Sequence, residues 1–470
     1  MSEKRTLKQI PNEVFRDYDI RGLSATQITP DFAARLGSAI AIMFSRKKHN
    51  SVYVGRDCRL DSNKLSLALC EGLINHGMDV YDLGPVSTPV VNFSIHCGSN
   101  ADLGIMITAS HNPKHYNGFK ILVRDEVIDG ETLQQLQQLM LSPSPKCPQM
   151  GQIMAIDLSN TYLEAIARNC KPNADLKIVV DAGNAVVGPL AEQLFTKLGY
   201  NFIPIFCQPD GNFPNHDPNP SDEKNLAQLR DTVVANNADL GLAFDGDGDR
   251  LVVITASGAI VWPDQLMMIF AQDILRQHPK TEVVFDVKSS NRLSQLIIDN
   301  SGIPVMCKTG HSHVRRAVNE TGALIGGEFS GHIFFNDRWH GFDDGIYAAM
   351  RLLEILSHNE VNADNDLDKI LKKFSICADT PEILIPTTEA EKFPLMAKIA
   401  GQCKFLGAKV NTIDGLRVEY PKGWGLIRAS NTSAYLTMRF EADNAKELER
   451  IKKLFITELT PFINNVEDYL

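Results

Sequence analysis

Short apolar runs that alternate with helical patterns constrain this chain most, because they recur along most of its length. Residues 101–107, 177–181 and 283–287 have the length and composition of buried strands. Helical spacing of apolar residues follows Pro30 and covers about residues 62–75. Strands that alternate with helices in this way predict the α/β class, with a parallel or mixed sheet covered by helices on both faces.

Several further elements and breaks are expected from the same patterns. The other strands are expected at residues 51–55, 80–83, 120–123 and 238–243 and after Ala323, with an extended entry at 12–22 and a short helix after Pro89. The polar breaks are a first linker at 142–148, a long Pro/Asn/Asp-rich loop at 209–222, of the kind that often lines sites, and the stretch 358–368.

The last hundred residues follow a different pattern from the rest. Residues 435–441 alternate between apolar and polar side chains, which predicts a half-exposed strand, and residues 445–459 have helical periodicity. Because 470 residues exceed what one hydrophobic core usually organises, several domains are expected. The predicted domains are three α/β units at 1–152, 153–256 and 257–368, followed by a small α+β domain at 369–470.

Composition and charge disfavour several classes of function. No apolar run approaches the length of a membrane span, and the N-terminus lacks the apolar region of a signal peptide. Nine scattered cysteines without a Cys-x-x-Cys pair indicate neither a disulfide framework nor a zinc site, so a cytoplasmic location is expected. A net charge of -10 disfavours nucleic acid. No membrane or protein partner is indicated, and no oligomeric state.

The segment Thr-Ala-Ser-His-Asn-Pro at residues 108–113 follows an apolar run. Asn112 and Pro113 stop regular structure, because proline restricts its own φ and the conformation of the residue before it. Ser110 is therefore presented at the C-terminal end of an expected strand, where ligands of open α/β sheets usually bind. Taken alone, the segment could be an ordinary polar turn.

Three carboxylates, Asp245, Asp247 and Asp249, alternate with glycines. In an extended segment alternate side chains face one way, and the glycines let the backbone curl around an ion. Hard oxygen ligands suit Mg²⁺, whereas an EF-hand is excluded because Arg250 and Ala256 stand where that loop needs glycine and glutamate. A solvated acidic turn is the alternative, but three carboxylates in five residues repel one another, which favours a cation.

Two further polar segments could bind a sugar phosphate. Gly-Glu-Phe-Ser-Gly-His at 327–332 pairs Glu328 with Ser330, a sensible arrangement for sugar hydroxyls; a turn between strands is the alternative. The segment at 423–432 offers Arg428, two hydroxyls and an amide, which could hold a phosphate without a Walker sequence. A polar hairpin turn explains that segment equally well on its own.

In this order, the four segments resemble the phosphoserine, metal, sugar and phosphate loops of the α-D-phosphohexomutase superfamily. The resemblance extends to Phe-Arg-Asp-Tyr-Asp-Ile-Arg-Gly at 15–22 and Trp-His-Gly-Phe-Asp-Asp-Gly at 339–345, so it covers essentially the whole chain. The chain is most similar to the bacterial phosphomannomutase/phosphoglucomutase branch. The phosphoglucosamine mutase branch typically has glutamine and glycine where this chain has Phe329 and Asn431. Human-type phosphomannomutases have a haloacid-dehalogenase fold and a motif that residues 245–249 do not match.

The resemblance implies three related mixed α/β domains and a C-terminal α+β domain of the TATA-binding-protein type around a central cleft. It implies reversible phosphoryl transfer between C1 and C6 of hexose phosphates, of mannose, glucose or both. The phosphoryl group would pass through phospho-Ser110 and a hexose 1,6-bisphosphate, which is both intermediate and activator. Mg²⁺ is the implied cofactor, and hexose phosphates are the implied small-molecule partners.

The resemblance also implies a role for each matching residue. Catalytic roles fall on Ser110, His111, Lys120, Arg21 and Arg250, and either Lys120 or Arg21 would move the proton of the attacking hydroxyl. The implied metal ligands are Ser110, Asp245, Asp247 and Asp249. The implied substrate-binding residues are Tyr18, Lys288, His311, Glu328, Ser330, His332, Arg428, Ser430, Asn431 and Thr432.

Structural roles, without contact to substrate, stay open for some of these residues. His111 could only brace its loop, Lys288 could be a solvated strand end, and His311 and His332 could fill local hydrogen-bond sites. Trp339 and Phe342 are expected in the core rather than against a sugar.

The alternative functions are a phosphoglucosamine mutase, a Mg²⁺-dependent sugar-phosphate phosphatase and a sugar-phosphate-binding protein without activity. A serine hydrolase has little support, because Ser110 lies in no Gly-x-Ser-x-Gly elbow.

Overall fold

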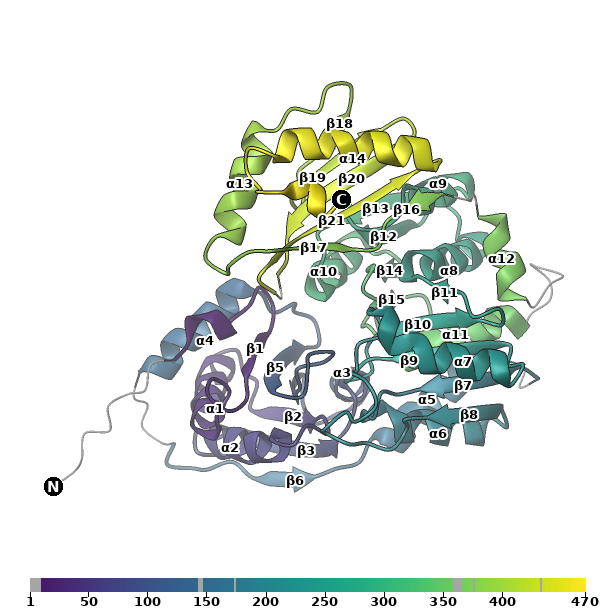
Figure 1. Cartoon of the computed structure of the whole chain (residues 1–470). Helices are drawn as coiled ribbons and strands as arrows, with labels where there is room; N and C mark the ends of the chain where they lie inside the picture. The colour runs from purple at the N-terminus through teal and green to yellow at the C-terminus, as the bar shows by residue number, and fades with distance from the viewer. Residues whose placement is uncertain (1–9, 143–146, 173–174, 358–365, 375–376, 432) are drawn as a thin grey trace. The chain divides into compact units, whose positions relative to one another are not determined.

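The computed structural model describes residues 10–142, 147–172, 175–357, 366–374, 377–431 and 433–470 (Figure 1). The chain forms two compact units. The first comprises residues 1–262 and 330–368, and the second comprises residues 263–329 and 369–470. The chain therefore passes from one unit to the other at three points, after Trp262, Phe329 and Asp368.

The first unit begins with a mixed sheet of strand order β1-β5-β4-β2-β3-β6. Its parallel strands are β2, β3, β4 and β6, whereas β5 pairs antiparallel with β4 and β1. The elements are η1 (Asn12–Val14), β1 (Ile20–Leu23), α1 (Pro30–Ser45), β2 (Ser51–Arg56), α2 (Ser62–Ile74), β3 (Asp79–Pro85), α3 (Thr88–Cys97), β4 (Leu103–Ile107), β5 (Tyr116–Val123), α4 (Gly130–Leu141) and β6 (Ile153–Ala155).

This sheet contains the strands and helices that its apolar runs predicted, with two differences. The expected extended entry at 12–22 contains a 3-10 turn before β1. Strand β6 returns to pair with β3, so the first sheet continues past residue 152. Residues 143–146 of the expected linker lie outside the described residues. Strand β4 is buried along its whole length, and the serine loop follows its C-terminal end.

The second sheet of the first unit has the order β11-β10-β9-β7-β8. Strand β7 is parallel to β8 and β9, and β10 runs antiparallel to β9 and β11. The elements are α5 (Ser159–Asn169), β7 (Lys177–Asp181), α6 (Val187–Lys197), β8 (Asn201–Ile205), η2 (Glu223–Leu226), α7 (Ala227–Ala235), β9 (Leu240–Phe244), β10 (Leu251–Thr255) and β11 (Ile260–Val261). The first unit also includes β15 (Ile333–Phe335) and α11 (Gly345–Ser357) from later in the chain, and β15 is not a strand of this sheet.

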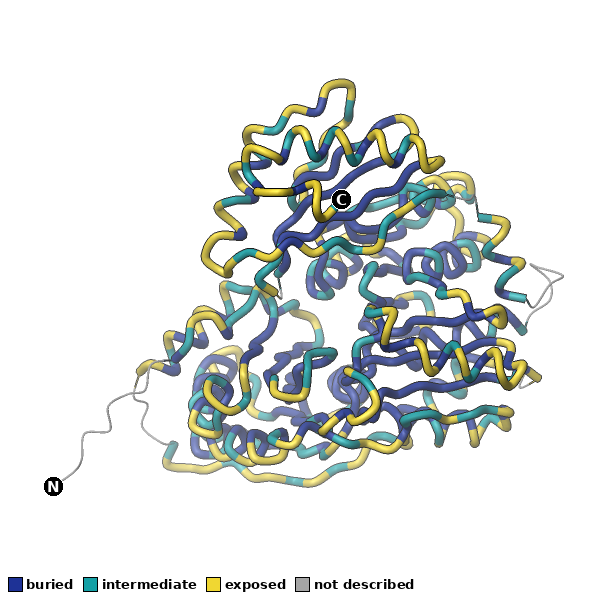
Figure 2. The backbone as a smooth tube through the Cα atoms, viewed as in Figure 1, coloured by how far each residue is buried: buried dark blue, intermediate teal, exposed yellow. Residues whose placement is uncertain are grey.

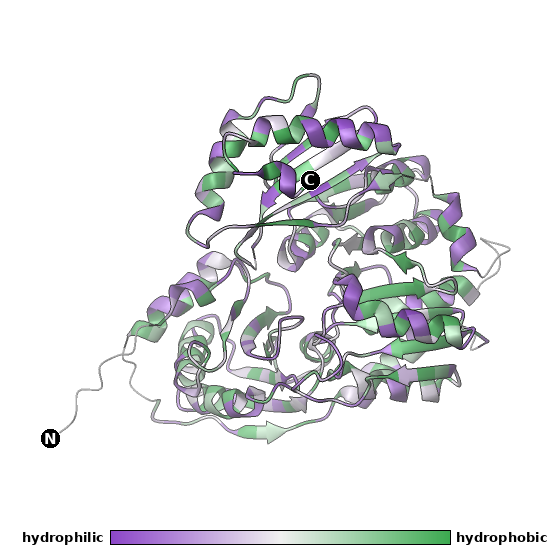
Figure 3. Ribbon diagram, viewed as in Figure 1, coloured by the Kyte–Doolittle hydropathy of each residue, from purple (hydrophilic) through white to green (hydrophobic). Residues whose placement is uncertain are grey.

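Strands β9 and β10 are hydrophobic along their length (Figure 3) and fully buried. The acidic segment 245–249 lies in the connection between them. It therefore joins two antiparallel core strands, of which the sequence patterns predicted only the first.

The second unit contains a parallel arrangement in which β12 pairs with β13 on one side and β14 on the other. The C-terminal ends of all three strands therefore lie at one edge. The elements are α8 (Pro263–Gln277), β12 (Glu282–Asp286), α9 (Asn291–Asp299), β13 (Ile303–Cys307), α10 (His311–Thr321) and β14 (Ile325–Gly327).

The C-terminal part of the second unit is an antiparallel sheet of order β16-β21-β20-β19-β18, with β17 also paired to β21. Helix α12 contains the point after Asp368 where the chain enters this unit. The elements are α12 (Leu367–Lys373), β16 (Ala378–Asp379), β17 (Ile383–Pro386), α13 (Lys392–Gln402), β18 (Lys409–Asn411), β19 (Leu416–Tyr420), β20 (Gly423–Ala429), β21 (Tyr435–Ala442), α14 (Ala445–Leu459) and η3 (Val466–Asp468).

The prediction that residues 435–441 form a half-exposed strand is wrong, because β21 is buried on both faces (Figure 2). Its apolar face packs in the core that α14 covers. On the other face, Arg439 lies 3.1 Å from Asp264 of α8 and stacks on the ring of Phe329, 3.7 Å from its centroid. A polar face with charged partners can be buried, and alternation alone does not reveal those partners.

Among the described residues, no helix is both long enough and apolar enough to cross a bilayer.

Candidate active site

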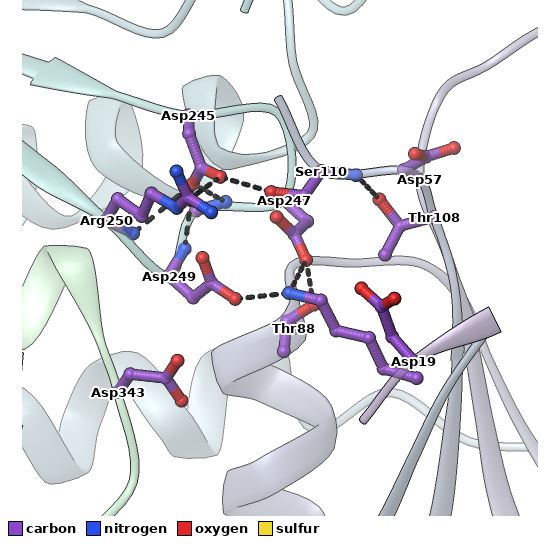
Figure 4. Close-up of polar contacts among 12 residues, drawn as sticks. Asp19, Asp57, Thr88, Thr108, Ser110, Asp245, Asp247, Asp249, Arg250 and Asp343 are labelled. Carbon is purple, nitrogen blue, oxygen red and sulfur yellow. Dashed lines mark hydrogen bonds and ion pairs between the residues drawn. The ribbon is translucent and has the colours of Figure 1, made fainter. Parts of the chain in front are cut away.

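The serine loop follows β4 and holds Ser110 in an unusual conformation. Ser110 has φ of 50°, in the left-handed region that non-glycine residues rarely adopt, and only 1% of its surface is exposed. Its backbone N–H donates to Thr108 Oγ1 at 2.8 Å (Figure 4). The N–H of Asn112 donates to the carbonyl of Ala109 at 3.0 Å. In this loop the hydroxyl of Ser110 points toward Asp245 (Figure 4).

A buried arginine that the sequence analysis missed holds this loop. Arg59 donates hydrogen bonds to the carbonyls of Ser110 (2.7 Å), Asn112 (2.6 Å), Pro113 (2.8 Å) and Tyr116 (3.0 Å). The third guanidinium nitrogen, Arg59 Nε, donates to Asp57 Oδ2 at 3.0 Å. The charged cluster Arg-Asp-Cys-Arg at 56–59, directly after a predicted strand, was the available signal.

The acidic segment is a tight turn and not the extended strand that alternation suggested. Asp245 Oδ1 accepts three backbone N–H bonds of 3.1–3.2 Å from residues 248, 249 and 250. Gly248 takes φ of 77°, and a Cβ on Gly246 would come within 2.3 Å of the Ser110 carbonyl. Glycine is needed at both positions, because one requires positive φ and the other lies against the serine loop.

The three carboxylates are buried together, which excludes a solvated acidic turn. Asp245, Asp247 and Asp249 are each at most 1% exposed, and one oxygen from each lies within 4.8 Å of the others. Lys120 Nζ bonds Asp247 Oδ2 at 2.6 Å and also Asp249 Oδ2, while Thr88 Oγ1 donates to Asp247 Oδ2. Among the described residues nothing donates to Asp247 Oδ1 or Asp249 Oδ1.

Those buried, unbonded carboxylate oxygens fit a metal ion. A buried acceptor without a donor is costly, and a bound cation would remove that cost. The donors are hard oxygens, which suit a divalent cation such as Mg²⁺. The residues that could hold it are Asp245, Asp247 and Asp249, with Ser110 beside them.

The electrostatics of the cluster are set by burial and by Lys120. Burial, and then the neighbouring carboxylates, raise the pKa of Asp245 well above its usual range, and the same causes raise the pKa of Asp249. Burial would also raise the pKa of Asp247, but Lys120 outweighs it and the pKa is lowered. The carboxylates in turn raise the pKa of Lys120 despite its burial. Lys120 therefore supplies the positive charge at the triad.

Ser110 contacts the triad directly. Its Oγ donates to Asp245 Oδ2 at 2.7 Å and lies 3.2 Å from His111 Nδ1. Burial, and then Arg250 and Arg21, lower the pKa of His111 well below its usual value. The loops that follow β4 and β9 thus bring the hydroxyl and the carboxylates together, although 135 positions separate them in the sequence.

Arg250 is oriented by a histidine and a carboxylate. Arg250 Nε donates to His332 Nε2 at 2.9 Å, so His332 carries its proton on Nδ1, which lies 2.7 Å from Asp343 Oδ2. Burial lowers the pKa of His332 to about 3, which keeps it neutral. His332 thus accepts a hydrogen bond at Nε2 from Arg250 and has the Asp343 carboxylate beside its Nδ1.

The serine loop is also bonded by an arginine of β1. Arg21 donates to Asn112 Oδ1 at 2.7 Å and to Asp19 Oδ2 at 2.5 Å, and it is 5% exposed. Tyr18 precedes this strand and is half-buried. The first unit therefore brings the predicted serine, acidic and catalytic basic residues together, namely Arg21, Ser110, His111, Lys120, Asp245, Asp247, Asp249, Arg250 and His332.

The second unit holds most of the predicted substrate-binding residues, and three of them lie near one edge of its parallel strands. Lys288 follows β12, His311 is the first residue of α10, and Glu328 follows β14. Lys288 is 6% exposed and lies 3.6 Å from Glu382, so a solvated strand end is excluded. Glu328 is 6% exposed. Ser330 belongs to the first unit, so the boundary between the units passes through the predicted sugar loop.

The predicted phosphate loop is mostly a strand. Residues 423–429 form β20, with the side chain of Trp424 fully buried, and the turn to β21 begins at Ser430. Arg428 Nε bonds Asp414 Oδ2 at 2.9 Å, and Asn431 Nδ2 donates to the carbonyl of Thr309 at 3.4 Å. The hairpin alternative therefore describes the backbone correctly, and its turn carries the predicted polar groups. Thr432 lies outside the described residues.

Trp339 and Phe342 are core residues of the first unit, as expected. Trp339 stacks on Tyr347 with ring centroids 4.5 Å apart, and Phe342 is fully buried.

Comparison with protein families matches the chain along nearly its whole length. Four models of phosphoglucomutase/phosphomannomutase domains match consecutive segments: α/β/α domain I at residues 12–144, domain II at 160–258, domain III at 262–374 and the C-terminal domain at 382–458. The predicted fold class, mixed α/β domains followed by an α+β C-terminal domain, is confirmed.

Individual proteins and a crystal structure are similar over the same length. The chain is 44% identical to a phosphomannomutase/phosphoglucomutase of Pseudomonas aeruginosa, over 96% of each chain. It is 41% identical to a phosphoglucomutase of Neisseria gonorrhoeae, over 96% of this chain and 97% of that protein. A phosphoglucomutase/phosphomannomutase family protein of Burkholderia thailandensis superimposes with a TM-score of 0.90 at 40% identity, covering 97% of this chain and 99% of that one. The chain therefore belongs to the phosphoglucomutase/phosphomannomutase family of the α-D-phosphohexomutase superfamily.

Proposed function

We propose that this protein is a phosphohexomutase that moves a phosphoryl group reversibly between C1 and C6 of mannose and glucose phosphates. The group passes through phospho-Ser110 and a hexose 1,6-bisphosphate, which turns over in the site and returns its other phosphate to Ser110. The observation that carries the proposal is the 2.7 Å hydrogen bond from Ser110 Oγ to Asp245 Oδ2, inside a buried carboxylate triad.

The surroundings of Ser110 support its role as a phosphoryl carrier. Phosphoryl transfer needs positioning and charge stabilisation more than covalent chemistry from the protein. Arg59 and Arg21 anchor the loop through its carbonyls and Asn112, which holds the hydroxyl in one direction. Lys120 and Arg250 add positive charge beside a group that would be dianionic once phosphorylated.

The donor set of the triad supports Mg²⁺ as the cofactor. Ser110, Asp245, Asp247 and Asp249 would hold it, and its chemistry there would be Lewis-acid stabilisation of the phosphoryl oxygens. Lys120 or Arg21 would assist proton movement at the attacking sugar hydroxyl, with Tyr18 nearby.

The substrate would be bound mainly by residues of the second unit. Glu328, with Ser330 of the first unit, would bind sugar hydroxyls, and the Oγ of Ser330 is buried without a hydrogen bond from the described residues. The non-reacting phosphate would be held by Arg428, Ser430, Asn431 and Thr432, and Lys288 and His311 would add basic groups to the substrate site. Arginine and backbone or amide N–H groups are suited to that anion.

Product analysis by ³¹P NMR tests the proposal. Purified protein is incubated with mannose 1-phosphate or glucose 1-phosphate, Mg²⁺ and a trace of glucose 1,6-bisphosphate, and hexose 6-phosphate is the expected product. Free sugar with inorganic phosphate would instead indicate a phosphatase. No turnover by protein that carries one phosphoryl group on Ser110, measured by intact mass, would indicate a binding protein.

The preferred sugar is tested separately. We expect higher kcat/KM for glucose 1-phosphate and mannose 1-phosphate than for glucosamine 1-phosphate, because Phe329 stands where the phosphoglucosamine mutase branch typically has glutamine. A preference for the glucosamine substrate would assign the chain to that other activity.

A further inference from the structure

One buried carboxylate lies where the three parallel strands of the second unit end. Asp286 is the last residue of β12, the middle strand, and is fully buried. Its Oδ2 accepts from Thr309 Oγ1 at 3.0 Å, and Thr309 follows β13. Its Oδ1 accepts from Ser289 Oγ at 2.8 Å and from the backbone N–H of Phe329 at 3.2 Å, after β14. Asp286 therefore bonds the segments that leave both neighbouring strands.

A second carboxylate extends this chain of bonds to the C-terminal sheet. Asp414 Oδ2 accepts from the backbone N–H of Thr309 at 3.0 Å and from Arg428 Nε at 2.9 Å. The carbonyl of Thr309 accepts from Asn431 Nδ2 at 3.4 Å. Every polar group of Thr309, hydroxyl, N–H and carbonyl, is thus bonded to a different segment of the second unit.

The bonded segments are those that carry the proposed substrate groups. Phe329 is adjacent to Glu328, and Thr309 lies two residues before His311. Arg428 near the end of β20 and Asn431 in the turn after it belong to the predicted phosphate loop. We propose that Asp286, Thr309 and Asp414 form a hydrogen-bond chain that positions the sugar-binding and phosphate-binding segments relative to each other. The inference rests on the proposed function and adds three positioning residues, none of which is itself placed on substrate.

The physical reason is that a hexose phosphate must reach both segments at once. Its hydroxyls and its non-reacting phosphate are held by groups from different strands, and a misplacement of about 1 Å can cost on the order of 100-fold in rate. Carboxylates in a buried setting give short, directional bonds to neutral donors, stronger than bonds between neutral groups. The chain of bonds therefore holds the spacing of the two segments before substrate arrives.

Thr309→Val is the direct test, because valine has nearly the shape of threonine but cannot donate to Asp286. We expect KM for glucose 1-phosphate to rise by about tenfold or more, with kcat changed less than about threefold, because uniform substrate binding is what is lost. Phosphorylation of Ser110 and Mg²⁺ binding, which belong to the first unit, should stay at wild-type levels. Thr309→Ser restores the donor and should return KM to within about twofold of wild type.

The matched control is Thr255→Val in the first unit. Thr255 is also fully buried and also donates to an aspartate, Asp368, at 2.9 Å. This variant should lose stability to a similar extent while its KM stays within about twofold of wild type. A KM increase of equal size in both valine variants would show a general effect of lost stability and overturn the proposal.

A double-mutant cycle separates positioning from a merely structural role. Arg428→Lys and Thr309→Val should be non-additive in kcat/KM, because Asp414 accepts from Arg428 Nε and from the backbone N–H of Thr309, and the bond from the Thr309 hydroxyl to Asp286 positions that N–H. Additive losses would contradict the chain of bonds, and so would a Thr309→Val variant that folds and keeps wild-type KM. If Thr309→Val does not fold, Thr309→Ser alone provides the test. Because serine keeps the donor to Asp286, a rise of about tenfold in its KM would overturn the inference. Failure of the proposed function is distinguishable, because wild-type protein would then yield no hexose 6-phosphate.

Discussion

The loop that carries Ser110 is held by a fork of hydrogen bonds from one arginine. Arg59 reaches four carbonyls of the loop and the strand after it, and it is 3% exposed. Guanidinium presents its donors in a rigid planar fork, whereas an ammonium is a point charge with three donors. The backbone at Ser110 is strained at φ of 50°, and such strain persists only where surrounding bonds enforce it.

Arg59→Lys should therefore loosen the serine loop. We expect kcat to fall by about tenfold or more, and the free energy of unfolding to fall by about 2–4 kcal/mol, because buried carbonyls lose their donors. Steady-state kinetics and urea unfolding measure the two effects. Arg124→Lys is the matched control, since Arg124 also donates to two carbonyls, those of Ile95 and Gly98, outside this loop. Equal loss of kcat in both variants would contradict the role of Arg59.

Asp247→Asn tests the metal site with little change of shape. We expect Mg²⁺-dependent transfer to fall by at least about 10²–10³-fold, because a carboxylate is lost where charge must be stabilised. The melting temperature of wild-type protein should rise with added Mg²⁺, because a ligand that binds only the folded state stabilises it, and the variant should lose this response. Asp231→Asn on the exposed face of α7 is the control. Retained transfer with a retained Mg²⁺ response would remove Asp247 from the metal site.

Strand β21 shows how an element with a polar face can lie in a core. Its residue Arg439 bonds Asp264 and the carbonyl of Lys288, and stacks on Phe329. On β19, which β20 separates from β21, Arg417 donates to the carbonyls of Val287 and Ser289. The C-terminal sheet is thereby bonded to the segments around β12, and its polar face is covered by charged and aromatic partners.

Arg439→Gln should be far more destabilising than an equivalent change on the surface. Removing one partner of a buried ion pair typically costs about 3–5 kcal/mol, because the other charge remains buried. Arg450→Gln, on α14, breaks an exposed pair with Glu447, and such pairs contribute at most about 1 kcal/mol. Urea unfolding of both variants measures the difference. Similar losses would mean that the polar face of β21 is hydrated in solution.

The N-terminus of α11 carries a buried carboxyl group that should make stability depend on pH. Burial is the largest cause that raises the pKa of Asp344 from 3.8 to about 7. Its Oδ1 accepts from Tyr162 Oη of α5 at 2.8 Å and from the N–H of Tyr347 at 2.9 Å, and its neighbour Asp343 adds a further negative charge. The folded protein therefore binds this proton more tightly than the unfolded chain. The contribution of Asp344 to the free energy of unfolding therefore falls as pH rises from about 4 to about 7 and then levels off.

Asp344→Asn should remove this pH dependence. Asparagine keeps the acceptor for Tyr162 and Tyr347 but does not ionise, so the variant should match wild type near pH 4 and be more stable above pH 7, by more than about 1 kcal/mol. Urea unfolding at both pH values measures this difference. Asp31→Asn is the control, because Asp31 lies in the first turn of α1 with 57% of its side chain exposed. A variant that is less stable than wild type at pH 8 would contradict the protonated carboxyl.

At the scale of the whole molecule, each compact unit combines two segments that are not consecutive in the sequence. Residues 263–329 and 369–470 form one unit, tied by Arg417 and Arg439. The four domains expected from the sequence stay a prediction. If the units move relative to each other, the hinge points are where the chain passes between them, after Trp262, Phe329 and Asp368.

The second unit should therefore move as one body when substrate binds. Spin labels incorporated site-specifically at Asp299 and Lys446, both exposed and both in the second unit, should keep their distance on addition of glucose 6-phosphate. A pair at Asp231 and Lys446 spans the two units and should change its distance. A changed distance within the second unit would instead mean that the C-terminal sheet moves alone.

Local patterns in the sequence were sufficient for the class of fold, the order of the four loops and the family. These patterns are short-range features: the periods of strands and helices, Pro and Gly at turns, and three carboxylates in five residues. Each can be recognised without knowing which distant residues it contacts. Ser110 and the aspartates were predicted as parts of one site from their resemblance to known loops. The structure brings these residues together.

The partners of those residues were decided only by the tertiary structure. Arg59 bonds Ser110 across 51 positions and Lys120 bonds Asp247 across 127, and no periodicity relates residues so far apart. The same holds for Thr309 and Asp414, and for the buried polar face of β21. The periodicity of side chains along an element predicts which face each one occupies, but only the tertiary structure determines what covers that face. Local chemistry thus predicted which groups form the candidate site, and long-range packing decided what holds them in place.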